Sequence, residues 1–188
     1  MKPNLITQGI VALSMLLGTF GYAQNEMLPV GANADAIGKR IEARDQSMIG
    51  RRLPAFIADT MDGSVFSSTE TKRITLYYMW DDCGDPCLNL FPTFNALQKE
   101  FGDTVDFIAI TYQNKARISE TTRTHPLAFR QAIMDKSTIE ELKLSTGYPT
   151  TLIVADGVIV FCHSGGPMDP GRCQQWGVEL KEIISQYL

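Results

Sequence analysis

The chain has 188 residues, of which 17 are basic and 21 are acidic, so its formal net charge is −4. This mild acidity, without a run of basic residues, argues against nucleic acid or an anionic membrane surface as the main partner. The length suits one domain that can bury a sizeable hydrophobic core. Such a domain does not need disulfides for its stability, so the four cysteines need another explanation.

The first residues have the pattern of an export signal. Lys2 precedes an apolar stretch over 10–20 that is too short to span a bilayer, and Gly21 and Ala23 have the small side chains that suit cleavage after Ala23. We therefore expect a signal peptide over 1–23, with an uncleaved membrane anchor as the alternative. Export would leave the protein periplasmic or secreted, where disulfides form and persist.

A polar segment follows the signal peptide. Residues 24–48 are small or polar, with a weak helical period over 34–43, and we interpret them as a leader or linker. A single folded domain is expected over 49–188.

The domain is predicted to begin with a β-hairpin and a buried strand. Residues 54–58 and 64–66 flank Asp62-Gly63, a dipeptide typical of tight hairpin turns. Residues 74–80 are rich in β-branched and aromatic side chains and almost continuously hydrophobic, which predicts a central strand covered on both faces.

A helix and a second core strand should follow. Apolar residues recur at helical spacing before Gly102, which is expected to end the helix, and they are Leu90, Phe94, Leu97 and Phe101. Residues 105–111 again suit a core strand. This strand-helix-strand order predicts a parallel pair.

The C-terminal half is predicted to add helices and a second hairpin. Residues 126–133 and 138–144 look helical, whereas 151–154 and 158–161 flank a turn at Asp156-Gly157. A terminal helix is lined by Trp176, Leu180, Ile183, Ile184 and Tyr187. The chain thus predicts an α/β fold: a central mixed β-sheet flanked by helices, with an N-terminal β-hairpin.

Two cysteines lie just after the first core strand, at the mouth of a predicted helix. A helix N-terminus favours thiolate over thiol, and Cys83 and Cys87, four residues apart, would share one helix face at a separation compatible with a disulfide. We interpret them as a redox pair in which Cys83 is the nucleophile and Cys87 the resolving thiol. The alternative is an inert disulfide that ties a loop to a helix.

The same region resembles the thioredoxin superfamily, and most closely the exported TlpA/ResA-like thiol-disulfide oxidoreductases. The resemblance is carried by Trp80, Cys83-Gly84, Pro86-Cys87 and the later run Gly147-Tyr148-Pro149-Thr150-Thr151, and it extends from about residue 49 to 188. It departs from the family at Asp85, which turns Cys-x-x-Cys into Cys-x-x-x-Cys.

The resemblance implies a thioredoxin-like fold with a cis proline at Pro149. It also implies a substrate-binding site formed by Trp80, Tyr148 and Pro149; the alternatives are simple core packing for Trp80 and a trans proline that starts an edge strand for Pro149. The expected activity is exchange of disulfides with client proteins or small molecules, supported by a thiol electron donor and needing no bound cofactor.

Acidic residues surround the pair in the sequence. Asp81, Asp82 and Asp85 lie close to Cys83, and nearby negative charge disfavours a thiolate. A thiol that is poorly ionised does not suit a strong oxidant, so a reducing or isomerising role is expected.

The remaining cysteines and His163 leave alternatives open. Cys162 ends a predicted strand and Cys173 begins the terminal helix, so we expect a structural disulfide between them, with a second redox pair as the alternative. Cys83, Cys87 and His163 together resemble the ligand set of Sco-like copper metallochaperones, the second functional candidate. The third is a redox-silent thioredoxin-like binding module, in which Asp85 has disabled the pair.

Overall fold

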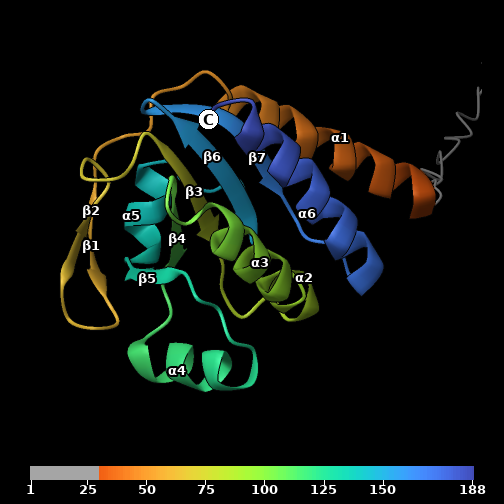
Figure 1. The fold of residues 1–188 in the computed structure, drawn as a ribbon. Helices are drawn as coiled ribbons and strands as arrows, with labels where there is room; N and C mark the ends of the chain where they lie inside the picture. Colours follow the sequence, from red (N-terminus) through yellow and green to blue (C-terminus); the bar gives the residue numbers. More distant parts are fainter. Residues whose placement is uncertain (1–29) are drawn as a thin grey trace, which may run out of the picture.

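The computed structural model describes residues 30–188 (Figure 1). The expected signal peptide over 1–23, and the first part of the expected leader, lie outside the described residues. Within residues 30–188, none of the helices combines the length and the apolar character needed to cross a membrane.

A seven-stranded mixed sheet forms the centre of the fold, with strand order β2-β1-β5-β4-β3-β6-β7. β3 pairs with β4, and β4 with β5, in parallel, whereas the other neighbours are antiparallel. The strands are β1 (Ile57–Thr60), β2 (Val65–Ser67), β3 (Ile74–Met79), β4 (Val105–Thr111), β5 (Arg130–Ile133), β6 (Thr150–Ala155) and β7 (Val158–Ser164). The expected α/β class, the mixed sheet and the N-terminal hairpin are confirmed.

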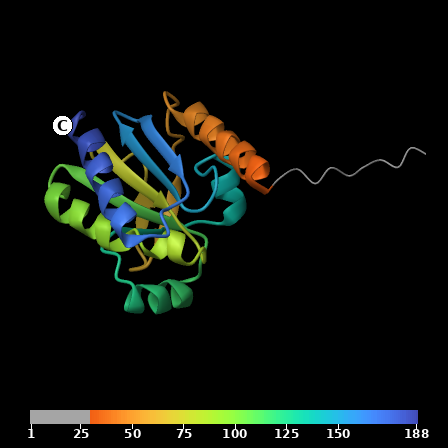
Figure 2. The ribbon, with the colours of Figure 1, turned by 90° about the vertical axis from the view of Figure 1, so that its right-hand side faces the viewer.

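Helices cover both faces of this sheet (Figure 2). They are α1 (Val30–Met48), α2 (Asp85–Leu88), α3 (Phe91–Phe101), α4 (Lys115–Thr124), α5 (Lys136–Glu141) and α6 (Pro170–Ser185). Along β3, Leu76 and Tyr78 pack against the cluster under α3 and α6, whereas Tyr77 and Met79 pack against the cluster that includes α5. A strand buried on both faces explains why β3 reads as a continuous hydrophobic run.

The local patterns predicted most elements correctly. The helical stripe before Gly102 became α3, with Phe94 and Leu97 buried, and Gly102 is its C-cap residue. The strand over Val105–Thr111 and the hairpin of β6 and β7 formed as expected. The terminal helix is α6.

Between β4 and β5 the sequence prediction was wrong. Residues 126–133 were expected to be helical, but the segment ends in β5, which pairs with β4 on one side and β1 on the other. The segment becomes a strand because β4 and β1 each have an unpaired edge next to it, and the local sequence pattern carries no information about those edges. Just before it, α4 is a helix that the sequence did not predict, because only Ile118 among its residues is buried.

Helix α1 covers the segment that the sequence assigned to a leader with a weak helix over 34–43. Near its C-terminal end Met48 joins the core on the α5 side of the sheet, and Asp45 is only 4% exposed. The Asp45 carboxylate accepts hydrogen bonds from the Thr146 hydroxyl at 2.6 Å and from the Ser164 backbone N–H at 2.7 Å. The chain before residue 49 therefore contributes buried contacts, and the expected domain boundary stays a prediction.

Candidate functional site

Cys83 and Cys87 form a disulfide at the end of the sheet where β3 stops. Their Cα atoms are 5.6 Å apart. Cys83 is half-buried, whereas Cys87 lies in the core and is 0% exposed. The two cysteines are therefore unequal, and Cys83 is the more exposed of the pair.

Gly84 explains how the fold accommodates Asp85. It is the N-cap of α2 with φ 64° and ψ −144°, a backbone conformation that residues other than glycine rarely adopt. Asp85 is the first helical residue, followed by Pro86, whose missing N–H is tolerated at the start of a helix. The additional residue thus lies in the first turn, and Cys83 precedes the cap.

The buried partner of the disulfide is held from the sheet. The Tyr78 hydroxyl donates to the Cys87 carbonyl at 2.9 Å, and burial raises the pKa of Tyr78 well above its ordinary value. The Cys87 backbone N–H donates to the Gly84 carbonyl at 3.0 Å. Cys87 is thus fixed both from β3 and from its own helix.

Trp80 corrects one expectation from the sequence. It was expected to contact substrates, but it is 1% exposed and its ring packs edge-on against Phe91. Its indole N–H donates to the Gln131 side-chain oxygen at 3.2 Å. Because Trp80 follows Tyr78 on the same face of the sheet, its side chain enters the core and offers no surface to a client.

The Tyr148-Pro149 peptide bond is cis, as expected. The Pro149 carbonyl accepts a hydrogen bond from the Gly165 backbone N–H at 2.8 Å. The next residue, Gly166, packs so closely on α2 that a Cβ atom there would lie 2.0 Å from the Pro86 carbonyl oxygen. The loop after β7 therefore connects the proline loop to the helix of the redox pair.

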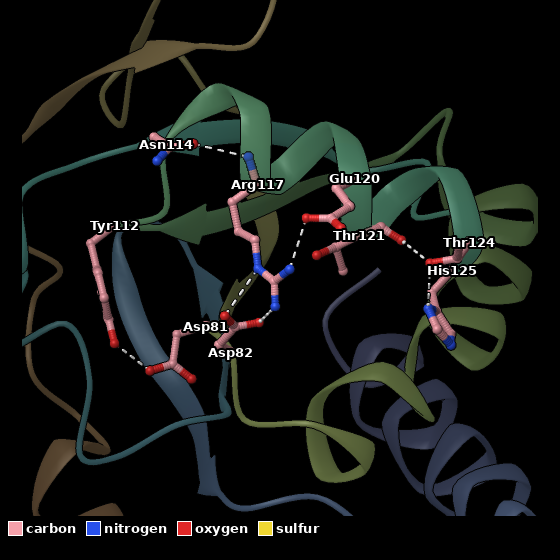
Figure 3. Close-up of polar contacts among 9 residues, drawn as sticks. All are labelled: Asp81, Asp82, Tyr112, Asn114, Arg117, Glu120, Thr121, Thr124 and His125. Carbon is pink, nitrogen blue, oxygen red and sulfur yellow. Dashed lines mark hydrogen bonds and ion pairs between the residues drawn. The ribbon is translucent and has the colours of Figure 1, made fainter.

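Asp81 is the acidic group nearest the sulfurs. One of its carboxylate oxygens and the sulfurs of Cys83 and Cys87 all lie within 4.8 Å of one another. The Tyr112 hydroxyl donates to the Asp81 carboxylate, which raises the pKa of Tyr112 to about 12 (Figure 3). The Tyr112 ring in turn packs edge-on against Tyr148, with the ring centres 5.5 Å apart.

Asp82 points to a different partner. The Arg117 guanidinium on α4 donates from Nε at 3.0 Å and from Nη2 at 2.7 Å to the two carboxylate oxygens of Asp82 (Figure 3). It also donates from Nη1 to the Glu120 carboxylate at 2.8 Å. These two carboxylates raise the pKa of Arg117 above its ordinary value.

The expected disulfide between Cys162 and Cys173 is absent from the structure. Both cysteines are buried and free. Cys162 packs in the core on the α5 side of the sheet, whereas Cys173 packs in the core under α3 and α6. The alternation of side chains along β7 sends Cys162 to the face opposite α6, and burial raises the pKa of both thiols.

His163 does not join the redox pair as a metal ligand. Its ring packs against Trp176, with the ring centres 4.4 Å apart, and burial lowers its pKa. Among residues 30–188, the side chains whose ligand atoms gather closely enough to share an ion are Asp81, Cys83 and Cys87. His163 is not part of this group, so the copper ligand set expected from Cys83, Cys87 and His163 does not come together.

Sequence reasoning recognised Asp81 only as a charge. It missed Tyr112 and Arg117 altogether. These residues contact the loop across 31 and 35 positions of the chain, which no local spacing records.

Comparisons with known proteins agree with this geometry. No protein-family model matches the chain. It is 29% identical over 122 residues to "Thioredoxin-like protein YneN" of Bacillus subtilis, covering 62% of this chain and 71% of that protein.

Two solved structures carry the same fold. A thiol:disulfide interchange protein from Bacteroides sp. matches with a TM-score of 0.60 at 15% identity, covering 73% of this chain and 90% of the other. The pneumococcal exposed lipoprotein thioredoxin Etrx1 from Streptococcus pneumoniae matches with a TM-score of 0.53 at 18% identity, covering 67% and 99%.

The fold is the one seen in these thioredoxin-like structures, and the Cys83–Cys87 disulfide lies at the start of α2. The resemblance to thioredoxin-like proteins, expected from the sequence, is confirmed.

Proposed function

We propose that this protein is an exported thiol-disulfide oxidoreductase that exchanges disulfides with protein or small-molecule thiols. One observation carries the proposal: the Cys83–Cys87 disulfide joins a half-buried cysteine to a fully buried one at the start of α2. Such an asymmetry suits a pair in which one sulfur meets the client and the other resolves the product.

The reduced protein starts the exchange. The Cys83 thiolate attacks one sulfur of a client disulfide, forms a mixed disulfide and releases the other client sulfur as a thiolate, which takes a proton from solvent. The Cys87 thiol then loses its proton and attacks the Cys83 sulfur, which releases the second client thiol. The client gains two electrons, the protein returns to the disulfide form, and a thiol donor reduces it again.

Asp81 is suited to accept the proton of Cys87 in the second step. Its carboxylate lies within 4.8 Å of both sulfurs, and Tyr112 fixes its orientation. Cys87 itself is fully buried, so solvent does not reach its thiol in this conformation. An Asp81→Asn variant should accumulate mixed disulfide because resolution slows, whereas an unchanged rate of resolution would remove Asp81 from the mechanism.

Tyr148 and Pro149 are proposed to receive the client. A strand of the client would pair with the backbone beside Pro149. This backbone lies near the Cys83–Cys87 pair, because Gly165 bonds to Pro149 and Gly166 packs on α2. Trp80 is left out of this site because its ring lies in the core, whereas Pro149, although also buried, is proposed to act through the neighbouring backbone.

The direction and the location are also proposals. Three carboxylates near Cys83 oppose stabilisation of its thiolate, which favours a reducing or isomerising role. Export is supported by the signal-like pattern of residues 1–23 and by the similarity to a thioredoxin described as an exposed lipoprotein.

Trapping tests the proposal. Reduced Cys87→Ser protein, mixed with a disulfide-containing protein such as insulin, should accumulate a mixed disulfide through Cys83 that mass spectrometry detects. Cys83→Ser should form none, and Cys173→Ser should react like the unaltered protein because that buried thiol is outside the pair. Failure of Cys87→Ser to form any adduct would mean that the pair is redox-silent.

A further inference from the structure

Three aspartates flank Cys83, and the proposed mechanism gives a role only to Asp81. Asp81 is hydrogen-bonded to Tyr112, and Asp85 lies in the first turn of α2. Within residues 30–188, Arg117 is the only basic side chain that forms an ion pair with any of the three aspartates, and its partner is Asp82.

The position of Arg117 is set by its helix rather than by the loop. The Asn114 side chain caps α4 and accepts a hydrogen bond from the Arg117 backbone N–H at 2.9 Å (Figure 3). One residue later, Ile118 is buried in the core under α3 and α6, which anchors the helix. The guanidinium is therefore presented to Asp82 from a fixed base.

The contact itself is two-pronged. Two guanidinium nitrogens meet the two oxygens of Asp82, a geometry that orients a carboxylate as well as neutralising it. Glu120 on the next turn of α4 binds the third nitrogen of the same guanidinium and so restrains it further. Figure 3 shows that Asp81 and Asp82, although adjacent, extend to separate partners.

We propose that Arg117 is a positioning residue of the redox pair, which holds the Asp82 carboxylate on α4 and so keeps its charge away from the Cys83 sulfur. The inference rests on the proposed function, because it concerns the reactivity of Cys83 as a nucleophile. Without Arg117, the Asp82 side chain is free to turn towards Cys83, and its charge is no longer balanced.

Other charged or titratable groups around the loop stay in place in this comparison. With Cys87 replaced by serine throughout, they belong to the loop itself, α2, the segment after β4, the segment before β6 and α4, and they are Asp81, Asp85, Tyr112, Tyr148 and Glu120. A change that depends on both Arg117 and Asp82 therefore reports their pairing and not the general acidity of the site.

The test measures the pH profile of Cys83 alkylation in reduced Cys87→Ser protein. Arg117→Gln should move the midpoint upward by about half a pH unit, as expected for a unit charge brought to about 6 Å in water, so the rate at pH 7 falls roughly threefold. The shift should shrink at about 1 M salt because the screening length falls to about 3 Å.

Three further variants decide whether the effect runs through Asp82. Asp82→Asn should leave the midpoint unchanged or lower it, and adding Arg117→Gln to Asp82→Asn should produce no further shift. Arg123→Gln, which removes the same charge from the far end of α4, should leave the profile unchanged.

Several outcomes would overturn the inference. They are an unchanged midpoint in Arg117→Gln, an equal shift in Arg123→Gln, and an equal effect of Arg117→Gln with and without Asp82. If Cys83 fails to react even in the parent Cys87→Ser protein, the proposed function fails, and the inference fails with it.

Discussion

Replacement of Gly166 by alanine should separate the loop after β7 from the redox helix. The new Cβ atom would lie 2.0 Å from the Pro86 carbonyl oxygen, 3.0 Å from its carbon and 3.2 Å from a Leu90 methyl carbon. Non-bonded carbon atoms prefer separations of about 3.5–4.0 Å, so loop and helix must move apart by more than about 1 Å. The obstacle is backbone rather than a flexible side chain, and we expect a loss of about 1–3 kcal/mol in the free energy of unfolding.

Urea unfolding of the oxidised protein measures that loss, and Gly147→Ala is a matched control. Gly147 belongs to the neighbouring proline loop, and a Cβ atom there would meet only the Ser164 Cβ at an ordinary 3.9 Å. Gly166→Ala should also slow capture of insulin by the Cys87→Ser trap, because the surface beside Cys83 changes. Equal stability of the two alanine variants would refute the claim that Gly166 is required for close packing on α2.

Two further predictions concern side chains around the pair. Trp80→Ala should lower the free energy of unfolding by about 3–5 kcal/mol, because it removes a fully buried ring and leaves the Gln131 side-chain oxygen without its donor. A loss under about 1 kcal/mol would contradict the assignment of Trp80 to the core. The hydrogen bond from Tyr112 to Asp81 raises the pKa of Tyr112 from 10.0 to about 12 in the folded protein. The contribution of this hydrogen bond to the free energy of unfolding is therefore fully present below pH 10 and is lost as the pH approaches 12. Chemical unfolding from pH 8 upward should therefore show the unaltered protein more stable than Tyr112→Phe, with a difference that narrows above pH 10; a constant difference would argue against the hydrogen bond as its cause.

The elements that the sequence predicted correctly are those that depend on the pattern of residues close together in the chain. The stripe of α3 and the continuous apolar run of β3 depend on neighbouring residues, and so does the Asp156-Gly157 turn. By contrast, β5 exists because β4 and β1 leave edges to be paired, and polar α4 depends on the Asn114 cap and one buried residue. Neither of these causes has a periodic signature.

The site shows the same division. Cys83, Cys87 and the cis bond at Pro149 could be located from motifs, since each is marked by its immediate sequence. The directions of the Asp81 and Asp82 side chains depend on Tyr112 and Arg117, which the fold delivers from other elements. The positions of Cys162 and Cys173 on opposite faces likewise follow from strand alternation and not from their separation in the chain.

Helix α1 sets a practical limit on how the protein can be shortened. A fragment that starts at residue 49 would lack Asp45, the acceptor shared by Thr146 and Ser164, which flank the Tyr148-Pro149 turn and the strand end that leads to Gly165. The hydroxyl and N–H donors of Thr146 and Ser164 would then need water as their acceptor, and the residues beside Tyr148 and Pro149 would lose the carboxylate that they share. Recombinant work on this protein should therefore retain the whole of α1.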